Sequence, residues 1–552
     1  MSAGRGVHLR ETQDPGGAIG VPGVLEPGLR EPARPASARD ELARDELAPH
    51  ELAPDELTDV DVLELIAVLC RSLDDEGVRY CHWKSNESIA RSASGENDLD
   101  LLVSRSDAER FEGILRRLGF KDTRQPRWKQ LPGVYHSYGV DATGALVHIH
   151  AHYQLVIGDD MTKNIHLPVE GAYLASSTPD LTFMLPSPAF ELAVFLIRMT
   201  VKHCTWDAFV TFQGSLSRSE RRELDDLLGR VDLGEVWALA DRHLPFISRD
   251  LWERCLRSVK PGSSRWFQIR TASRLQRTLS GWSRRPPAFD TWVRMWRRVR
   301  TVFRRKLLRR GPVRNQLASG GALIAIVGGD GAGKSTVVDS LSRWLSSEHI
   351  DSHTMHMGKP KWSPLTAVVK GLLKLVAATR RSTTSSAKAL RSSLVASDEG
   401  TMTLRNRARL GWEVLTARDR YRTYRRARRL ASNGSLVLCD RYPLPHVSLM
   451  DGAVTARMKD PARWGRWARF LATIERRYYD RISSPDILIV LRLDPDIAVE
   501  RKRGVEPESS VRPRSEEIWR MDWRGTPAIV IDAASPKEQV LSEIRSMIWS
   551  RL

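Results

Sequence analysis

Cysteine is scarce in this sequence: five residues in a chain of 552, far apart and without a Cys-x-x-Cys pair. That spacing excludes a disulfide framework and a cysteine-based zinc site, and it favours a reducing cytosol. Long apolar runs are absent as well, so the sequence predicts no membrane-spanning helix. The first residues lack the apolar segment of a secretory signal, which argues against export. We therefore expect a cytoplasmic protein.

Acidic residues are also in deficit, because 67 Asp and Glu face 86 Lys and Arg and leave a formal net charge of +19. This charge favours anionic partners. The excess is uneven: residues 284–310 hold eleven Lys or Arg and one acid, Asp290. The same segment carries an apolar stripe at helical spacing that includes Trp292, Trp296 and Phe303.

Three interpretations of this basic stripe are open. It can be a helix that packs between domains and leaves its cationic face in water. It can lie on an anionic membrane surface, because Trp and Phe opposite Lys and Arg is typical of such helices, and the protein would then be membrane-peripheral. Nucleic-acid binding is the least favoured, since no separate nucleic-acid-binding motif accompanies the charge. Homodimerisation is a further open alternative.

The length predicts two or three domains, since one core rarely serves so long a chain. Residues 1–57 are rich in Pro, Gly and Ala with almost no aromatic side chains, which predicts a disordered tail. A first α+β domain is expected over 58–186 and a helical basic region over 187–310. Gly311-Pro312 and Ala318-Ser-Gly-Gly321 are typical of a linker, and an α/β domain is expected over 320–552.

The glycine-rich stretch after residue 327 is the clearest motif. Gly328, Gly333, Lys334 and Ser335 fit the pattern Gly-x4-Gly-Lys-Ser/Thr, between an apolar strand and a helical pattern. Backbone N–H groups of such a loop surround phosphates, the lysine contacts the β- and γ-phosphates and the serine binds Mg²⁺. The pattern predicts an ATP-binding loop, and the alternative is a glycine-rich turn that binds nothing. The predicted ATP-binding residues are Gly328, Gly329, Asp330, Gly331, Ala332, Gly333, Lys334, Ser335 and Thr336.

Four later apolar segments, 353–357, 435–439, 486–493 and 528–531, predict the remaining strands of a parallel sheet with helices between them. Ligands of such sheets bind at the carboxyl ends of the strands. Asp440 follows the second of these segments and is expected to hold Mg²⁺, while Arg441 is expected to contact phosphate oxygens.

Gly329-Asp-Gly-Ala-Gly-Lys-Ser-Thr336, Ala417-Arg-Asp-Arg420 and Leu438-Cys-Asp-Arg-Tyr442 together resemble the thymidylate kinase family. The resemblance covers about residues 320–552. It implies a P-loop NTPase domain with a three-layer α/β/α fold, ATP and Mg²⁺ as cofactors, and phosphate transfer as the reaction. It also implies that Arg420 binds the acceptor phosphate and that Arg501 and Arg503 form a closing lid.

The sequence departs from that family at His356-Met-Gly-Lys-Pro-Lys361 and at Pro443-Leu-Pro445, where the family contacts its deoxynucleotide. The acceptor is therefore open: a nucleotide or another anionic small molecule. The long run from Pro364 to Val395 is interpreted as an acceptor-side insertion. A competing interpretation treats the glycine loop as a nucleotide-dependent switch in a binding protein.

A second candidate site lies near residue 100. Asp98 and Asp100 alternate with leucines on an expected strand, so both carboxylates face one side and suit divalent metals. With Ser94 and Gly95 before them, they resemble the nucleotidyltransferase-like superfamily, which implies nucleotidyl transfer as an alternative activity. The later strand expected to bear a third carboxylate carries His148, His150 and His152 instead. These histidines share a face, and metal binding, polar packing and substrate contact all remain open.

Overall fold

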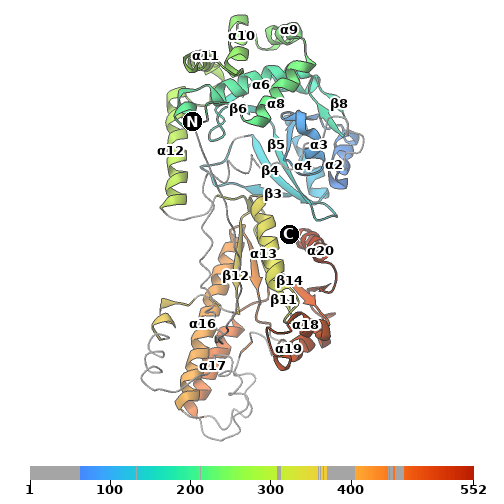
Figure 1. Cartoon of the computed structure of the whole chain (residues 1–552), viewed down its shortest axis with the longest axis vertical. Helices are drawn as coiled ribbons and strands as arrows, with labels where there is room; N and C mark the ends of the chain where they lie inside the picture. Colours follow the sequence, from blue (N-terminus) through green and yellow to red (C-terminus); the bar gives the residue numbers. More distant parts are fainter. Residues whose placement is uncertain are drawn as a thin grey trace, which may run out of the picture. The chain divides into compact units, whose positions relative to one another are not determined.

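The computed structural model describes residues 62–552 apart from 132, 181, 212, 308–312, 359, 361, 365, 370–403, 445–446, 448–451 and 454–464. The predicted tail over 1–57, Arg309 and Arg310 of the basic segment, and most of the predicted insertion at 364–395 lie outside these residues. All described residues belong to one of two compact units, Val60–Leu552. Its described elements are shown in Figure 1.

The first sheet has six strands in the order β1-β2-β5-β4-β3-β10. Their bounds are β1 Tyr80–His82, β2 Leu99–Val103, β3 Lys121–Arg124, β4 Val134–Val140, β5 Leu146–His152 and β10 Gln316–Leu317. β2 and β5 are parallel, and the other pairs are antiparallel. The leucines and valines of one face pack on α2 (Glu64–Asp75) and α4 (Ala108–Arg117) in one apolar cluster. Side chains alternate along a strand, so the intervening Asp and His residues lie on the other face.

A helical region follows, as the sequence predicts. Its helices are α6 Pro188–His203, α7 Trp206–Val210, α8 Arg218–Arg230, α9 Leu233–His243, α10 Arg249–Val259, α11 Arg265–Thr278 and α12 Pro287–Lys306. Helix α6 is buried along almost its whole length and packs with α8, α9 and α10. Ser187 caps its first turn and Pro188 occupies the first helical position, where a missing N–H costs nothing. A capping box of Ser217 and Glu220 starts α8.

Short elements complete the first half of the chain. These are η1 Asn86–Ser88, α3 Ile89–Ala93, η2 Arg105–Asp107, α5 Glu170–Ala175, η3 Ser280–Trp282 and two ribbons, β6 Leu155–Ile157 with β7 Ile165–Leu167 and β8 Thr178–Asp180 with β9 Phe183–Leu185.

Helix α12 packs on the rest of the protein through its arginine face. A packing helix was expected to bury its apolar face instead. Its aromatic and aliphatic stripe is in water: Trp292 is 60% exposed, Val299 63% and Leu307 67%. Arg294 instead is buried, with Nη1 2.9 Å from Asp207 and Nε 3.2 Å from Asp290. Interior carboxylates therefore decide which face is buried, and the interpretation of a packing helix with a solvated cationic face is wrong for Arg294, Arg297 and Arg298. Among the described residues, no helix is long and apolar enough to cross a membrane.

The second sheet has five parallel strands in the order β12-β13-β11-β14-β15, which confirms the predicted parallel sheet. The bounds are β11 Leu323–Gly328, β12 Ser352–His356, β13 Leu436–Asp440, β14 Ile487–Arg492 and β15 Ala528–Asp532. Alternate side chains of β11 and β14 enter two separate cores. One contains residues of α13 (Lys334–Ser347) and α20 (Lys537–Arg551), and the other residues of α16 (Leu404–Ser432) and α19 (Glu508–Arg520), so helices cover both faces.

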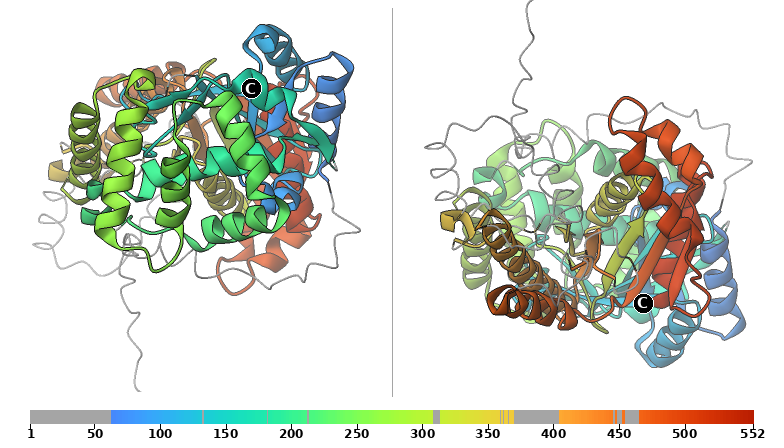
Figure 2. Two further views of the ribbon diagram at one scale, coloured as in Figure 1. Left: turned by 90° about the horizontal axis from the view of Figure 1, so that it is seen from above. Right: turned by 90° about the horizontal axis from the view of Figure 1, so that it is seen from below.

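Two further helices complete this half, α17 Arg466–Asp480 and α18 Pro495–Arg501, which precedes α19. Helix α17 runs beside α16 in Figure 1 and in the right-hand view of Figure 2. Leu410 of α16 packs on Ala468 and Leu471 of α17.

The expected linker contains a strand that connects the two sheets. β10 pairs with β3, and the Ala318 N–H donates to the Asp122 carbonyl. Asn315 bridges to Ile350 and donates its side-chain N–H to the Tyr138 hydroxyl at 2.7 Å. Residues 315–318 are therefore part of the folded structure rather than a spacer.

Candidate functional site

The glycine loop lies where the sequence places it, between β11 and α13. Gly331 has φ +87° and its absent Cβ would lie 3.0 Å from the carbonyl oxygen of Ala498, so a side chain would be strained on both counts. A Cβ on Gly328 would lie 2.7 Å from the carbonyl oxygen of Leu491. α13 begins at Lys334 directly after the loop, so its first N–H groups are directed at the space the loop surrounds.

The Lys334 ammonium group is buried inside this loop. Its Nζ donates to the carbonyl oxygens of Gly328 at 3.0 Å and Gly329 at 2.7 Å. A cation, a helix N-terminus and turned backbone therefore occupy one place, and each of them attracts anions.

Ser335, in the first turn of α13, contacts Asp440 at the end of β13. The Ser335 hydroxyl donates to Asp440 Oδ2 at 2.9 Å, and Asp440 ends β13 opposite Ile326 of β11. The other oxygen, Oδ1, is buried and has no hydrogen-bond partner among the described residues. His356 of β12 brings its Nε2 to 3.9 Å from Oδ2. A hydroxyl and a carboxylate oxygen in need of a partner are the ligand types that Mg²⁺ prefers.

Asp330 anchors the loop to two arginines. Arg514 of α19 lies 2.7 Å from Oδ2, and Arg441 lies 3.3 Å from Oδ1. Burial alone would raise the pKa of Asp330, but the hydrogen bond from Arg514 and the charges of Lys334 and Arg441 hold that pKa below its ordinary value. The carboxylate is thus ionised and fixes both guanidinium groups beside the loop.

Two features of this loop were not predicted from the sequence, the contact of Arg514 and the backbone conformation of Arg441. Arg514 was missed, although a basic residue soon after the predicted lid was a usable signal. Arg441 has φ +63°, in the left-handed region that costs an ordinary residue about 1 kcal/mol. Backbone strain of this kind gathers at functional positions, where the surrounding structure enforces it.

Arg420 is completely buried on α16. Its Nε donates to the Met357 carbonyl at 2.8 Å, Nη2 donates to the Gly358 carbonyl at 3.3 Å, and Nη1 donates to the Tyr479 hydroxyl. The Met357 N–H in turn donates to the Asp440 carbonyl. Arg420 therefore ties the segment that departs from the thymidylate kinase pattern to α16, and the Met357 N–H ties the same segment to the strand end that carries Asp440.

The predicted lid arginines have other partners in this structure. Arg501 donates to the Ala533 carbonyl at 3.1 Å, and Arg503 is largely exposed and forms an ion pair with Glu500. Neither contact involves the glycine loop. The structure thus groups Lys334, Ser335, Asp440 and Arg441 together and leaves Arg501 and Arg503 outside the group.

The second candidate site is on the polar face of the six-stranded sheet. Gly95 has φ +76° in the turn before β2, and the Ser94 hydroxyl donates to the Arg91 carbonyl, away from the carboxylates. Asp100 lies opposite His150 on β5, and Lys84 Nζ lies 3.0 Å from Asp100 Oδ1. As predicted from the alternation, Asp98 and Asp100 face the same side, because His150 lies 3.5 Å from one and 3.3 Å from the other.

The histidines surround these carboxylates. His148 Nδ1 donates to Asp98 Oδ1 at 2.8 Å. Burial would raise the pKa of Asp98, but the hydrogen bond from His148 holds this pKa down to about 2. Burial lowers the pKa of His152 to about 4 and also lowers the pKa values of His136 and His148. The face thus combines ionised carboxylates with neutral imidazoles.

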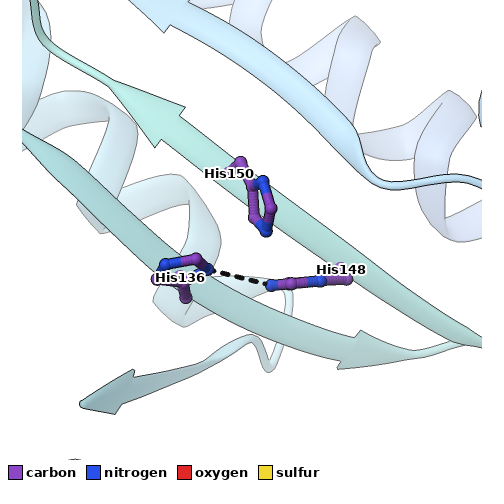
Figure 3. Close-up of side chains that lie close together, drawn as sticks. All are labelled: His136, His148 and His150. Carbon is purple, nitrogen blue, oxygen red and sulfur yellow. Dashed lines mark hydrogen bonds between the residues drawn. The ribbon is translucent and has the colours of Figure 1, made fainter. Parts of the chain in front are cut away.

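The histidines that converge are not the three of the strand pattern. His136 of β4 joins His148 and His150, as Figure 3 shows. Their ligand atoms lie within 4.8 Å of one another. His152 lies farther along β5, against Trp83 and Asp100. Metal binding by His148, His150 and His152 was one of three open alternatives. The structure instead groups His136 with His148 and His150, because the β4–β5 register brings a histidine from the next strand nearer.

Comparison with known proteins gives little. No known protein family matches the sequence, and no curated protein does. A solved structure of thymidylate kinase from Candida albicans is similar to 42% of this chain over 91% of its own length, with 18% identity and a TM-score of 0.27.

Proposed function

We propose that residues 320–552 form a P-loop phosphotransferase of thymidylate kinase type, with a three-layer α/β/α fold, that transfers the γ-phosphate of ATP to a nucleotide or another small anionic acceptor. The observation that carries this proposal is the contact of Ser335 with Asp440 beside the buried Lys334. A phosphate loop alone fits a binding protein, but a paired hydroxyl and carboxylate add the metal ligands that phosphate transfer needs.

The roles on the donor side follow from these contacts. Backbone N–H groups of Gly328 to Thr336 would hold the phosphates, and Lys334 would exchange its two carbonyl partners for β- and γ-phosphate oxygens. Ser335 and Oδ1 of Asp440, which has no hydrogen-bond partner in the described part of the chain, fit Mg²⁺. The ion, when bound, would neutralise charge between the phosphates.

On the acceptor side, Arg441 and Arg420 are the proposed anion contacts. Arg441 follows Asp440 directly in the chain, whereas Arg420 is buried and would have to exchange the Met357 and Gly358 carbonyls for acceptor oxygens. Arg501 and Arg503 would move toward the phosphates only when the segment after α18 closes. Positioning and charge stabilisation provide the rate in such chemistry, so no covalent nucleophile is required.

The test is transfer of labelled γ-phosphate from ATP to a panel of nucleoside monophosphates and other phosphorylated metabolites. Wild type should transfer to at least one acceptor, and Lys334→Ala should lose transfer. Lys537→Ala, an exposed lysine at the start of α20, is the matched control and should keep it. ATP binding by wild type without transfer to any acceptor would favour the nucleotide-switch interpretation.

A separate observation concerns α12. We infer that this helix contacts an anionic membrane surface, so that the protein is cytoplasmic and membrane-peripheral. Its exposed stripe combines Trp and Phe, and Arg300 lies 5.2 Å from the ring of Trp296 at the margin of that stripe. The net charge of +19 adds long-range attraction to anionic lipid.

Vesicles of phosphatidylserine and phosphatidylcholine test this contact. Wild type should co-sediment with mixed vesicles, and Trp292→Ser with Trp296→Ser should reduce binding at least tenfold. Trp467→Ser, an equally exposed tryptophan of α17, should bind as wild type does. Equal sedimentation of all three proteins would refute the contact. A dimer that the paired substitutions dissociate would assign the stripe to a second copy instead.

Nucleotidyl transfer at Asp98 and Asp100 remains the alternative activity, since both carboxylates share a face with Lys84 and His150. Incorporation of labelled α-phosphate that survives Lys334→Ala and is lost in Asp98→Ala would establish it. Absence of such incorporation across the common triphosphates would reject it.

A further inference from the structure

We propose that His136, His148 and His150 bind one divalent transition-metal ion of the Zn²⁺ class. This histidine site is distinct from the Mg²⁺ ligands Ser335 and Asp440, and it does not depend on the proposed kinase activity. Neutral imidazole nitrogens suit zinc, copper, iron and nickel, whereas Mg²⁺ prefers oxygen ligands.

The spacing of the nitrogens carries the proposal. His136 Nδ1 lies 3.2 Å from His148 Nε2, and all three ligand atoms lie within 4.8 Å. A tetrahedral zinc ion with Zn–N bonds of about 2.0 Å separates its ligand nitrogens by about 3.3 Å. Two histidines therefore already have the separation that a shared ion requires, and the third lies at most about 1.5 Å beyond it.

The strand register builds this site without a specialised loop. Across the antiparallel β4–β5 pair, His136 lies opposite His150, and Tyr138 lies opposite His148. All these side chains point to one face, and Figure 3 shows the three imidazole rings turned toward a common point. The Tyr138 ring stacks on His148 with centroids 4.0 Å apart and planes 8° apart. This stacking fixes the His148 ring before any ion arrives, which lowers the cost of binding.

The groups behind the histidines match an outer coordination shell. Metal-binding histidines usually donate their second ring N–H to a carboxylate or a carbonyl oxygen. His148 donates Nδ1–H to Asp98, so its Nε2 carries a lone pair that faces His136 Nδ1 and can ligate. His136 has Nε2 3.2 Å from the Gln125 amide, whose oxygen and nitrogen can exchange places, so Nδ1 can ligate while Nε2–H donates to Gln125. The Asp98 side chain is 46% exposed, which leaves an approach from solvent.

The competing explanation is a hydrogen-bonded chain with no ion. Gln125 would donate to His136, His136 to His148, and His148 to Asp98, and every group would be satisfied. A metal changes this order, because both facing nitrogens of His136 and His148 must present lone pairs. The two explanations therefore predict different metal affinities and different effects of replacing Gln125. In the hydrogen-bonded chain Gln125 acts only as a donor to His136, whereas at a metal site it accepts from His136.

The experiment titrates full-length protein, stripped of metal by a chelator, with Zn²⁺ and with Co²⁺. We expect one ion per chain by elemental analysis, and a Co²⁺ complex with the intense visible absorption of tetrahedral nitrogen coordination. His136→Ala and His148→Ala should each weaken binding at least 100-fold. Asp98→Asn and Gln125→Ala keep the ligands and should weaken it about 10- to 100-fold. His353→Ala, a partly exposed histidine of β12, is the matched control.

Three outcomes would overturn the proposal: binding that His136→Ala leaves unchanged, a stoichiometry near zero, or displacement of Co²⁺ by millimolar Mg²⁺, which would assign the ion to Asp98 and Asp100. Asp98→Asn also guards against misfolding, since it leaves all three histidines in place. If it alone lost the Co²⁺ spectrum completely, a carboxylate-based site would replace the histidine site.

Discussion

Replacement of Ser335 by alanine should remove the Mg²⁺-dependent part of nucleotide affinity and little else. In the wild type the hydroxyl donates to Asp440 Oδ2 at 2.9 Å, while Oδ1 is already buried without a partner among the described residues. In the variant, Oδ2 of the buried Asp440 carboxylate therefore loses its Ser335 donor, and Oδ1 still has no partner among the described residues. It also removes one of the two proposed oxygen ligands of the ion.

The size of the effect follows from one contact. A hydrogen bond to a charged group contributes about 1.5–3 kcal/mol, and each 1.4 kcal/mol is a tenfold change in an equilibrium constant. Ser335→Ala should therefore weaken Mg·ATP binding by about 10- to 150-fold. Binding of ATP in the presence of a chelator depends on Lys334 and on the backbone of the loop, so it should change less than about threefold.

A fluorescent ATP analogue titrated with and without Mg²⁺ measures both quantities. Ser347→Ala, at the exposed end of the same helix, is the control and should behave as wild type. An undiminished Mg²⁺ enhancement in Ser335→Ala would refute the assignment of the metal ligands. Equal loss with and without Mg²⁺ would mean that the substitution acts through the shape of the loop.

Three further changes have defined outcomes. Arg514→Ala should weaken ATP binding about tenfold by releasing Asp330 of the loop, whereas the exposed Arg512→Ala on the same helix should not. Burial raises the pKa of Glu191 to about 7, so the wild type loses stability as pH rises from about 4.5 to 7. Glu191→Gln should therefore raise the free energy of unfolding by up to about 3 kcal/mol at pH 8, seen as a higher melting temperature. At pH 4 the substitution should change the free energy of unfolding little. Arg294→Ala leaves buried carboxylates unpaired and should lower the opening free energy of α12 by about 3 kcal/mol in hydrogen exchange, and unchanged protection would contradict the ion pairs.

Local patterns predicted the second sheet well. The segments 353–357 and 435–439 correspond to β12 and β13 within one residue, because buried parallel strands appear in sequence as apolar runs. The glycine loop was equally accessible, since strand, loop and helix are contiguous in the chain. Ser335 and Asp440 were each expected to hold Mg²⁺, but their contact with each other was not predicted. It agrees with the general rule that polar residues gather at the carboxyl ends of neighbouring parallel strands.

Partners that come from distant segments were not predictable. The periodicity of α12 shows which residues share a face, but it does not show which face the interior accepts. That choice depends on Asp159 and Asp207, which lie more than eighty residues earlier and attract Arg298 and Arg294 inward. His136 was missed for the same reason, because only the register of β4 on β5 places it beside His148.

The short strand β10 shows how the two sheets are joined. Its two residues lengthen the edge of the first sheet, while Asn315 just before them bridges to Ile350 of the second half and donates to the Tyr138 hydroxyl. Burial raises the pKa of Tyr138, so the phenol stays neutral and keeps this hydrogen bond over the ordinary pH range. The same ring stacks on His148. One buried tyrosine therefore contacts both the histidine site and the segment leading into the glycine loop, so the position of the His148 ring depends on how this segment joins the two sheets.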